Sequence, residues 1–337
     1  MPMPSLTLRS LRARPVVLTL KRPVVTRIAT ITQWPLVLID LATEEGIIGR
    51  AYLAPYIVKA MRYLVPALND LGTALQGRRL APLELFDAAR KSLHFVGYEG
   101  LSAIAVAGLD MAAWDALARA ANAPLCVLLG GSVGAVRCYN SNGLWLKAPA
   151  AVAEEAIELR AEGGFDGLKL RLGRDSLAED LATIVAVRKA VGSDINLMVD
   201  FNQGLDFAEA LQRCHAIDDL GLAWIEEPIV YDNLDGYARL AADLKNSHPN
   251  RRELLWTPGP AQGATAPGVR LGNAGFYAHR RRHRLAPGRR HLWRRWSAHV
   301  DASLSRGRGA RHARHRDGAL AGMAGLGQSR PAAGLRR

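Results

Sequence analysis

The chain of 337 residues is poor in cysteine, and no apolar run in it reaches the length of a membrane span. Its three cysteines, Cys126, Cys138 and Cys214, show neither a disulfide framework nor the close spacing of a zinc site. The first residues lack the apolar core of a signal peptide, because arginines interrupt them from residue 9 onward. We therefore expect a cytoplasmic protein without disulfides, structural zinc or a membrane segment.

Lysine and isoleucine are missing from residues 247–337, where arginine is abundant. That segment holds 19 arginines and three acids, a net charge of +16, whereas residues 1–246 hold 25 basic and 28 acidic residues, a net charge of −3. The overall charge of +13 therefore arises entirely in the last part of the chain. The body of the protein has no electrostatic reason to bind nucleic acid.

The order of the expected strands and helices predicts two domains of different kinds. Strands are expected in residues 5–53 and helices in residues 57–122, which indicates an α+β domain over residues 1–130. Within it, Glu44-Glu45-Gly46 is a plausible hairpin turn. In residues 131–246 strands and helices alternate, which predicts a parallel sheet covered by helices, with four of the eight units of a (β/α) barrel.

The alternating part begins with a short expected strand and contains two recognisable helix starts. Ser176 and Glu179 have the spacing of a capping box, and Asp206 is placed to cap the helix that follows it. Strands are expected at 136–141, 167–172, 195–201 and 222–226, and helices at 149–161, 176–191, 206–218 and 233–245.

Charged residues end three successive strands of this part. Lys169 and Arg171 end one strand, Asp200 ends the next, and Glu226 follows one strand-plus-helix unit later. Asn202 shares a strand face with Asp200, because residues two apart point the same way. Carboxylates that converge from adjacent strand ends suit Mg²⁺, a hard cation that prefers oxygen ligands. The alternative is that these acids are helix caps or lie on the surface.

Lys169 and Arg171 should point together into the barrel mouth by the same rule. Two adjacent cations are costly unless an anion is bound or one of them is neutral, although a solvated strand end would also explain them. Cations beside metal-binding acids indicate removal of the proton next to a carboxylate. That reaction needs a base on one face of the carbon and a divalent metal to hold the doubly charged enediolate.

Five segments together make a specific pattern. With them, residues 5–246 resemble the mandelate racemase branch of the enolase superfamily, in which a lysine or histidine base works with Mg²⁺. The resemblance implies an α+β capping domain on a modified TIM barrel, assembled as a homo-oligomer. The segments are Pro35-Leu-Val-Leu-Ile-Asp-Leu-Ala-Thr, Gly108-Leu-Asp-Met-Ala-Ala-Trp-Asp-Ala-Leu, Pro124-Leu-x-x-Leu-Leu-Gly, Met198-Val-Asp-Phe-Asn-Gln and Trp224-Ile-Glu-Glu-Pro.

The resemblance also implies a small carboxylate substrate, either a 2-hydroxy acid that is racemised or epimerised or a sugar acid that is dehydrated. It makes Asp200 and Glu226 the first two of three Mg²⁺ ligands. Lys169 and Arg171 fall on the family's Lys-x-Lys pair, whose second lysine is the base in the racemase. Because a guanidinium stays protonated, Arg171 is a poor base but a good carboxylate clamp, which favours dehydration over two-base racemisation. The candidate substrate-binding residues are Ser141 and Asn202.

Residues 247–337 contain none of the family's remaining parts, which are a Gly-Glu-Asn third ligand near position 252 and a later Asp and catalytic His. Our hypothesis is that this segment is the correct DNA read out of frame. With wobble bases chosen freely and the start moved by one nucleotide, it can encode TPIGENFYGP, MPDFMRIGGVTG, STHLYP and HWLEWQDWANPV, in family order. We therefore expect this frameshift product to be disordered or non-native and this copy of the enzyme to be impaired or inactive.

Two other interpretations stay open at this point. A non-catalytic protein could keep the capping domain and bind nucleic acid through its arginine-rich tail. Residues 1–246 could instead form a structural or assembly module. If the chain is an enzyme, the capping-domain loop near residues 22–33 is expected to help select the substrate.

Overall fold

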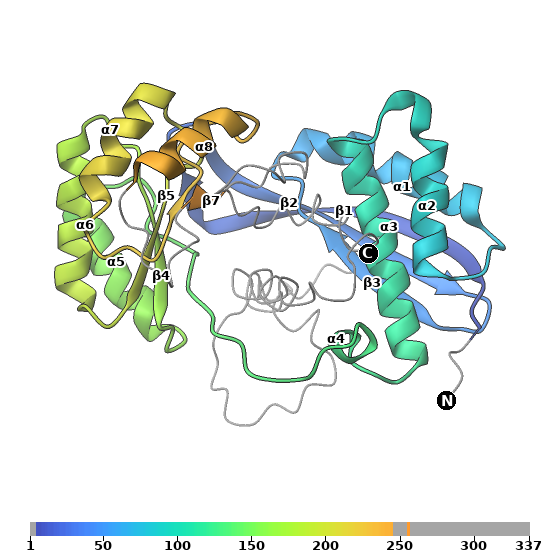
Figure 1. Ribbon diagram of the computed structural model, residues 1–337. Coiled ribbons are helices and arrows are strands. Elements are labelled where there is room, and N and C mark those ends of the chain that lie inside the picture. The colour runs from blue at the N-terminus through green and yellow to red at the C-terminus, as the bar shows by residue number, and fades with distance from the viewer. Residues whose placement is uncertain (1–4, 245–254, 257–337) are drawn as a thin grey trace, which may run out of the picture.

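The computed structural model describes residues 5–244 and 255–256 (Figure 1). Apart from the last two of these residues, the expectations for residues 247–337 lie outside the described part of the chain. An antiparallel sheet with helices forms the first half, and a parallel sheet with helices forms the second. This is the mixed α/β fold that the sequence predicts, with an α+β capping domain followed by (β/α) units.

The capping half is built on a long antiparallel hairpin. β1 (Leu8–Val25) pairs with β2 (Thr30–Thr43), and β3 (Ile48–Leu53) pairs with the other edge of β2. The turn between β2 and β3 lies at the predicted position, where Gly46 has a φ of +83°, a conformation that favours glycine. Figure 1 shows β1 and β2 extending from α1–α3 toward the parallel sheet. The helices are η1 (Val58–Ala60), α1 (Met61–Leu75), α2 (Pro82–Ser92), η2 (His94–Val96), α3 (Leu101–Ala120) and α4 (Leu125–Leu128).

Helix α3 is the most buried helix of this half, and it is apolar around most of its circumference. It lies so close to β3 that a Cβ on Gly49 would collide with the Ala112 carbonyl oxygen and the Ala116 side chain. Contrary to our expectation, it is long and apolar enough to cross a membrane, the only such helix in the described residues. Because 67% of its most apolar stretch is buried inside the protein, its composition is that of a core helix.

The second half has a parallel sheet with its strands in chain order, as predicted for (β/α) units. Its last strand, β7 at residues 255–256, was not predicted, because it lies in the segment that was expected to be disordered or non-native. Figure 1 shows α5, α6 and α7 on the side of this sheet that faces away from the capping half. The capping box of Ser176 and Glu179 and the cap of Asp206 are confirmed. The elements are α5 (Pro149–Ala161), β4 (Gly167–Arg171), α6 (Leu177–Val191), β5 (Asn196–Asp200), α7 (Phe207–Ile217), β6 (Ile225–Glu226), α8 (Leu234–Asp243) and β7 (Leu255–Trp256).

Two predicted strands of this half are wrong in extent. The segment 136–141 is not a strand, since Asn140 alone among its residues forms a bridge, a parallel one to Leu168. The Asn140 side chain accepts a hydrogen bond from the Asn142 backbone N–H at 3.0 Å, which turns the chain away after a single pair. The predicted strand at 222–226 is reduced to β6. The other predicted strands and helices of this half lie within three residues of their expected limits.

The close approach of α3 to β3 predicts a specific sensitivity. Gly49→Ala should lower the free energy of unfolding of the chain by about 1–3 kcal/mol, because the added methyl group has no room against the α3 backbone. Gly134→Ala is the matched control, since a Cβ at that position meets nothing within 4 Å. Urea unfolding of the two variants, followed by circular dichroism, measures the difference. Equal midpoints would contradict the tight packing described for α3.

Candidate active site

The carboxyl ends of β4, β5 and β6 lie side by side and bring the predicted charged residues together. Arg171 pairs in register with Asp200, and Asp200 pairs with Glu226. Side chains at these positions leave neighbouring parallel strands at the same level of the sheet. The convergence expected from the spacing in the sequence is therefore seen in the structure.

Lys169 lies between the two predicted metal-binding carboxylates. Its Nζ is 3.1 Å from both carboxylate oxygens of Glu226 and 3.1 Å from Oδ2 of Asp200. All three side chains are buried, with at most 7% of each residue exposed. Buried charges are tolerated only when they are paired, and this ammonium balances two carboxylates that would otherwise repel each other.

The pKa values at the site show how strongly these charges act on one another. Burial lowers the pKa of Lys169, but the charges of Glu226 and Asp200 outweigh it and raise that pKa above its ordinary value. Burial raises the pKa of Glu226, and Lys169 opposes this effect. The neighbouring Glu227 has its pKa raised to about 8, by burial and then by the charges of Asp200 and Glu226. The cluster is thus rich in acids, which favours an additional cation.

Arg171 is held beside Lys169 by contacts on several sides. Its NH1 donates to the Lys169 carbonyl oxygen at 3.0 Å and its NH2 to Oγ of Ser141 at 3.1 Å. Its Cζ lies 4.3 Å from the ring centroid of Trp145, in a cation–π contact. The guanidinium is buried, and its Nε is 3.8 Å from Oδ2 of Asp200. The structure thus brings Ser141 and Arg171 together at the predicted site.

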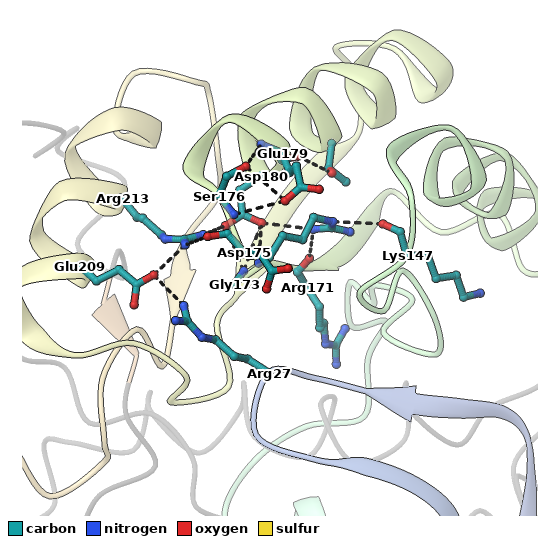
Figure 2. Close-up of polar contacts among 12 residues, drawn as sticks. Arg27, Lys147, Arg171, Gly173, Asp175, Ser176, Glu179, Asp180, Glu209 and Arg213 are labelled. Atoms are coloured by element: carbon teal, nitrogen blue, oxygen red, sulfur yellow. Dashed lines mark hydrogen bonds and ion pairs between the residues drawn. The ribbon is translucent and has the colours of Figure 1, made fainter.

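A second ion cluster holds the loop that follows β4, close to Arg171 (Figure 2). Asp180, at 1% exposure, accepts hydrogen bonds from the backbone N–H groups of Gly173 and Arg174 and from the guanidinium of Arg213. NH1 of Arg174 also donates to the Arg171 carbonyl oxygen at 3.1 Å. Asp180 therefore fixes the backbone on which the Arg171 side chain stands.

The same cluster reaches the loop of the capping half that joins β1 to β2. Figure 2 shows Arg27 pointing from this loop toward Glu209 of α7, and NH1 of Arg27 is 2.7 Å from Oε1 of Glu209. That oxygen also accepts from NH2 of Arg213 at 2.6 Å. An additional contact, from the Leu146 N–H to the Val25 carbonyl oxygen, joins the two halves nearby. The loop expected near residues 22–33 is thus mostly strand, and its connecting residues 26–29 are placed against the strand ends.

Backbone strain is concentrated just after the two predicted ligands. Asn202, Gln203 and Glu227 have φ values of +49°, +63° and +44°. Such left-handed conformations are unfavourable for these residues and occur often at functional sites. The Asn202 N–H donates to Oδ1 of Asp200 at 2.8 Å, and Nε2 of Gln203 donates to Oε1 of Glu227 at 3.2 Å. Asn202 thus positions Asp200 through its backbone, while its own Oδ1 is buried without a hydrogen-bond partner in the described residues.

Three residues of the site were not identified from the sequence. Trp224 donates from Nε1 to Oε2 of Glu226 at 3.1 Å, and its spacing of two residues from Glu226 could have indicated this. Glu227 was included only as part of the Trp224-Ile-Glu-Glu-Pro segment, although it is the third acid of the cluster. Trp145 gave no signal, because it lies in an irregular segment where no periodicity predicts which way a side chain points.

The chemistry of these donors fits Mg²⁺ in part. Asp200 and Glu226 supply two carboxylates at adjacent strand ends, and a cationic group already lies between them. Within the described residues, no group of three His, Cys, Asp or Glu side chains could hold a metal ion. The third ligand expected near position 252 lies outside the described residues. The site therefore matches two thirds of the ligand set that the family resemblance implies.

Comparisons with known proteins agree with this fold. Residues 9–130 match the mandelate racemase / muconate lactonizing enzyme N-terminal domain, and residues 151–249 match the enolase C-terminal domain-like family. The chain belongs to the mandelate racemase / muconate lactonizing enzyme type of the enolase superfamily.

Two solved structures share most of this fold. An enolase from alpha proteobacterium BAL199 with bound magnesium is 64% identical, with a TM-score of 0.71, and the match covers 75% of this chain and 68% of that one. A Bradyrhizobium enolase complexed with magnesium and mandelic acid is 36% identical, with a TM-score of 0.69, over 76% of this chain and 68% of that one.

Curated relatives have related activities. L-talarate/galactarate dehydratase from Salmonella typhimurium is 38% identical over 149 residues, which are 44% of this chain and 37% of that protein. Other relatives are a further sugar-acid dehydratase, cycloisomerases and dipeptide epimerases. The chain spans about two fifths of the length of the first three curated relatives that it matches.

Binding of Mg²⁺ should depend on the paired carboxylates. Asp200→Asn should weaken Mg²⁺ binding at least about tenfold, because it removes one of the two anionic ligands that Asp200 and Glu226 provide. Asp206→Asn makes the same change of charge at a helix cap, where asparagine serves equally well, and should leave the affinity unchanged. Isothermal titration calorimetry with MgCl₂ compares the two. If both variants bind Mg²⁺ like the unchanged chain, these carboxylates do not form the metal site.

Proposed function

We propose that the chain derives from a Mg²⁺-dependent enzyme that removes the proton next to the carboxylate of a 2-hydroxy acid or a sugar acid. The observation that carries the proposal is the buried cluster in which Lys169 lies 3.1 Å from both Asp200 and Glu226, with Arg171 adjacent. Support comes from relatives with the same fold, among them a sugar-acid dehydratase and an enolase complexed with magnesium and mandelic acid. Assembly into a homo-oligomer remains a prediction.

Each side chain of the cluster has a separate role in this proposal. Asp200 and Glu226 would hold Mg²⁺, which supplies positive charge where negative charge develops on the substrate carboxylate. Lys169 lies between these ligands, and their charges raise its pKa, so it is suited to hold a proton at Nζ beside the substrate. Trp224 and the Asn202 backbone fix one oxygen each of Glu226 and Asp200.

Arg171 decides between the two reaction types in the proposal. Racemisation or epimerisation by two bases needs a proton acceptor on each face of the carbon, and a guanidinium does not lose its proton in water. Asp200 also compensates the positive charge of Arg171 only in part, because its nearest oxygen is 3.8 Å from Nε of Arg171. It is therefore suited to bind a carboxylate oxygen. Dehydration of a sugar acid, started by one base, is the favoured reaction.

We further propose that this copy is impaired, because the groups required to complete the site are missing from the sequence of residues 247–337. Two carboxylates hold Mg²⁺ less firmly than three, and the family's second base is absent from that segment as well. The frameshift hypothesis explains both losses by a single event in the coding DNA.

A change of reading frame should restore turnover. The coding DNA should contain, after a one-base correction near codons 246–250, an open frame through GENFYGP and HWLEW. The corrected protein should turn over galactarate, mandelate or a related acid at least about 100-fold faster than the present chain, because it regains a catalytic group. Mg²⁺-dependent assays of both proteins on the same panel of acids measure this. Full activity of the present chain, or the lack of such a frame, would refute the proposal.

A further inference from the structure

Two buried N–H groups at the site have no acceptor within the part of the chain that the structure describes. Among the described residues, neither Nε1 of Trp145 nor Nε of Arg171 makes a hydrogen bond, and both atoms are shielded from solvent. The two residues are 6% and 5% exposed, and they are stacked on each other. A buried donor without a partner destabilises the protein, and it does so more when it is charged. Because the two side chains are in contact, a single ligand could supply acceptors to both donors.

Arg171 cannot satisfy its Nε by a small movement. Its NH1 and NH2 are already bound to the Lys169 carbonyl and the Ser141 hydroxyl, so rotation of the guanidinium would break both bonds. The distance of 3.8 Å from Nε to Asp200 is too long for a hydrogen bond. The loop after Trp145 is fixed too, since the Lys147 carbonyl accepts from Nε of Arg174 at 3.1 Å. Both donors are therefore preorganised, and binding would cost little side-chain entropy.

The chemistry of the two donors defines the ligand. An indole N–H and a guanidinium N–H both donate, so the ligand must present acceptor oxygens. The permanent charge of Arg171 favours an anionic acceptor, and hydrogen bonds between a guanidinium and a carboxylate are short and strong. Lys169 already balances part of the charge of Asp200 and Glu226. A cation bound to those carboxylates would leave Arg171 free to attract an anion.

We propose that Trp145 and Arg171 form a carboxylate-binding subsite, in which Nε1 of Trp145 and Nε of Arg171 donate to the carboxylate of a hydroxy acid. The subsite binds the carboxylate in the present chain even if the chain does not convert the acid to a product. The choice of a hydroxy acid rests on the proposed function, whereas binding of the carboxylate rests on the two donors alone. Trp145 is thus a substrate-binding residue that the family pattern did not indicate.

Calorimetry on the full chain with MgCl₂ tests this subsite, with mandelate and galactarate as probes and mandelamide as the uncharged analogue. Trp145→Phe keeps a ring under the guanidinium but removes the N–H, and it should weaken binding of the acids about tenfold. Arg171→Lys keeps the charge but removes the Nε donor, and it should weaken binding at least as much. Trp114→Phe, on α3, is the matched control and should bind like the unchanged chain. Mandelamide should bind more weakly than mandelate to the unchanged chain.

The outcomes separate this inference from the proposed function. Mg²⁺ affinity, measured on every variant, should be unchanged by Trp145→Phe, and this also shows that the variant is folded. If Trp145→Phe and Arg171→Lys bind the acids as tightly as Trp114→Phe, or if the unchanged chain binds mandelamide as well as mandelate, the subsite is wrong while the metal site stands. Failure of the unchanged chain to bind either acid also overturns the subsite. If Asp200→Asn binds Mg²⁺ as tightly as the unchanged chain, that result would instead count against the proposed function.

Discussion

A balance of charge buried between three parallel strand ends is the constraint on which the rest of the site depends. Lys169 lies between Asp200 and Glu226, and loss of its charge would leave two buried carboxylates facing each other in a region of low dielectric, at a cost of several kcal/mol. A parallel sheet permits this arrangement, because each strand delivers its last side chains to the same edge. The groups are also preorganised. They cannot turn away from a ligand without losing hydrogen bonds to one another.

The second ion cluster gives this edge its rigidity and connects it to the capping half. Asp180 holds the turn after β4 with several hydrogen bonds in a fully buried position, and it belongs to the permanent framework. The outer pair of Arg27 and Glu209 has side chains 36% and 23% exposed, so it contributes little to stability. The ion cluster therefore fixes the turn after β4 firmly and holds the capping loop only weakly.

The sequence predicted the parts of this structure that follow from local rules. Strand ends one unit apart predicted the convergence of Asp200 and Glu226, and capping spacing predicted the start of α6 at Ser176. It failed where a single side chain overrides a pattern, as when Asn140 ends an expected strand by bonding the backbone two residues later. Trp145 was out of reach for a related reason. Its stacking on Arg171 joins an irregular loop to a strand, and no sequence spacing encodes that contact.

Binding and catalysis should respond differently to the loss of part of a barrel. Catalytic groups act as a unit, so removal of one can cost nearly as much as removal of all. A binding subsite depends only on its own donors and on the residues that fix them. Trp145 and Arg171 are fixed by Ser141, the Lys169 carbonyl and the Arg174 contacts, all of which lie in the described (β/α) units. Under the proposed function, a chain without a third ligand and a second base would therefore keep the binding of its substrate even where it has lost the reaction.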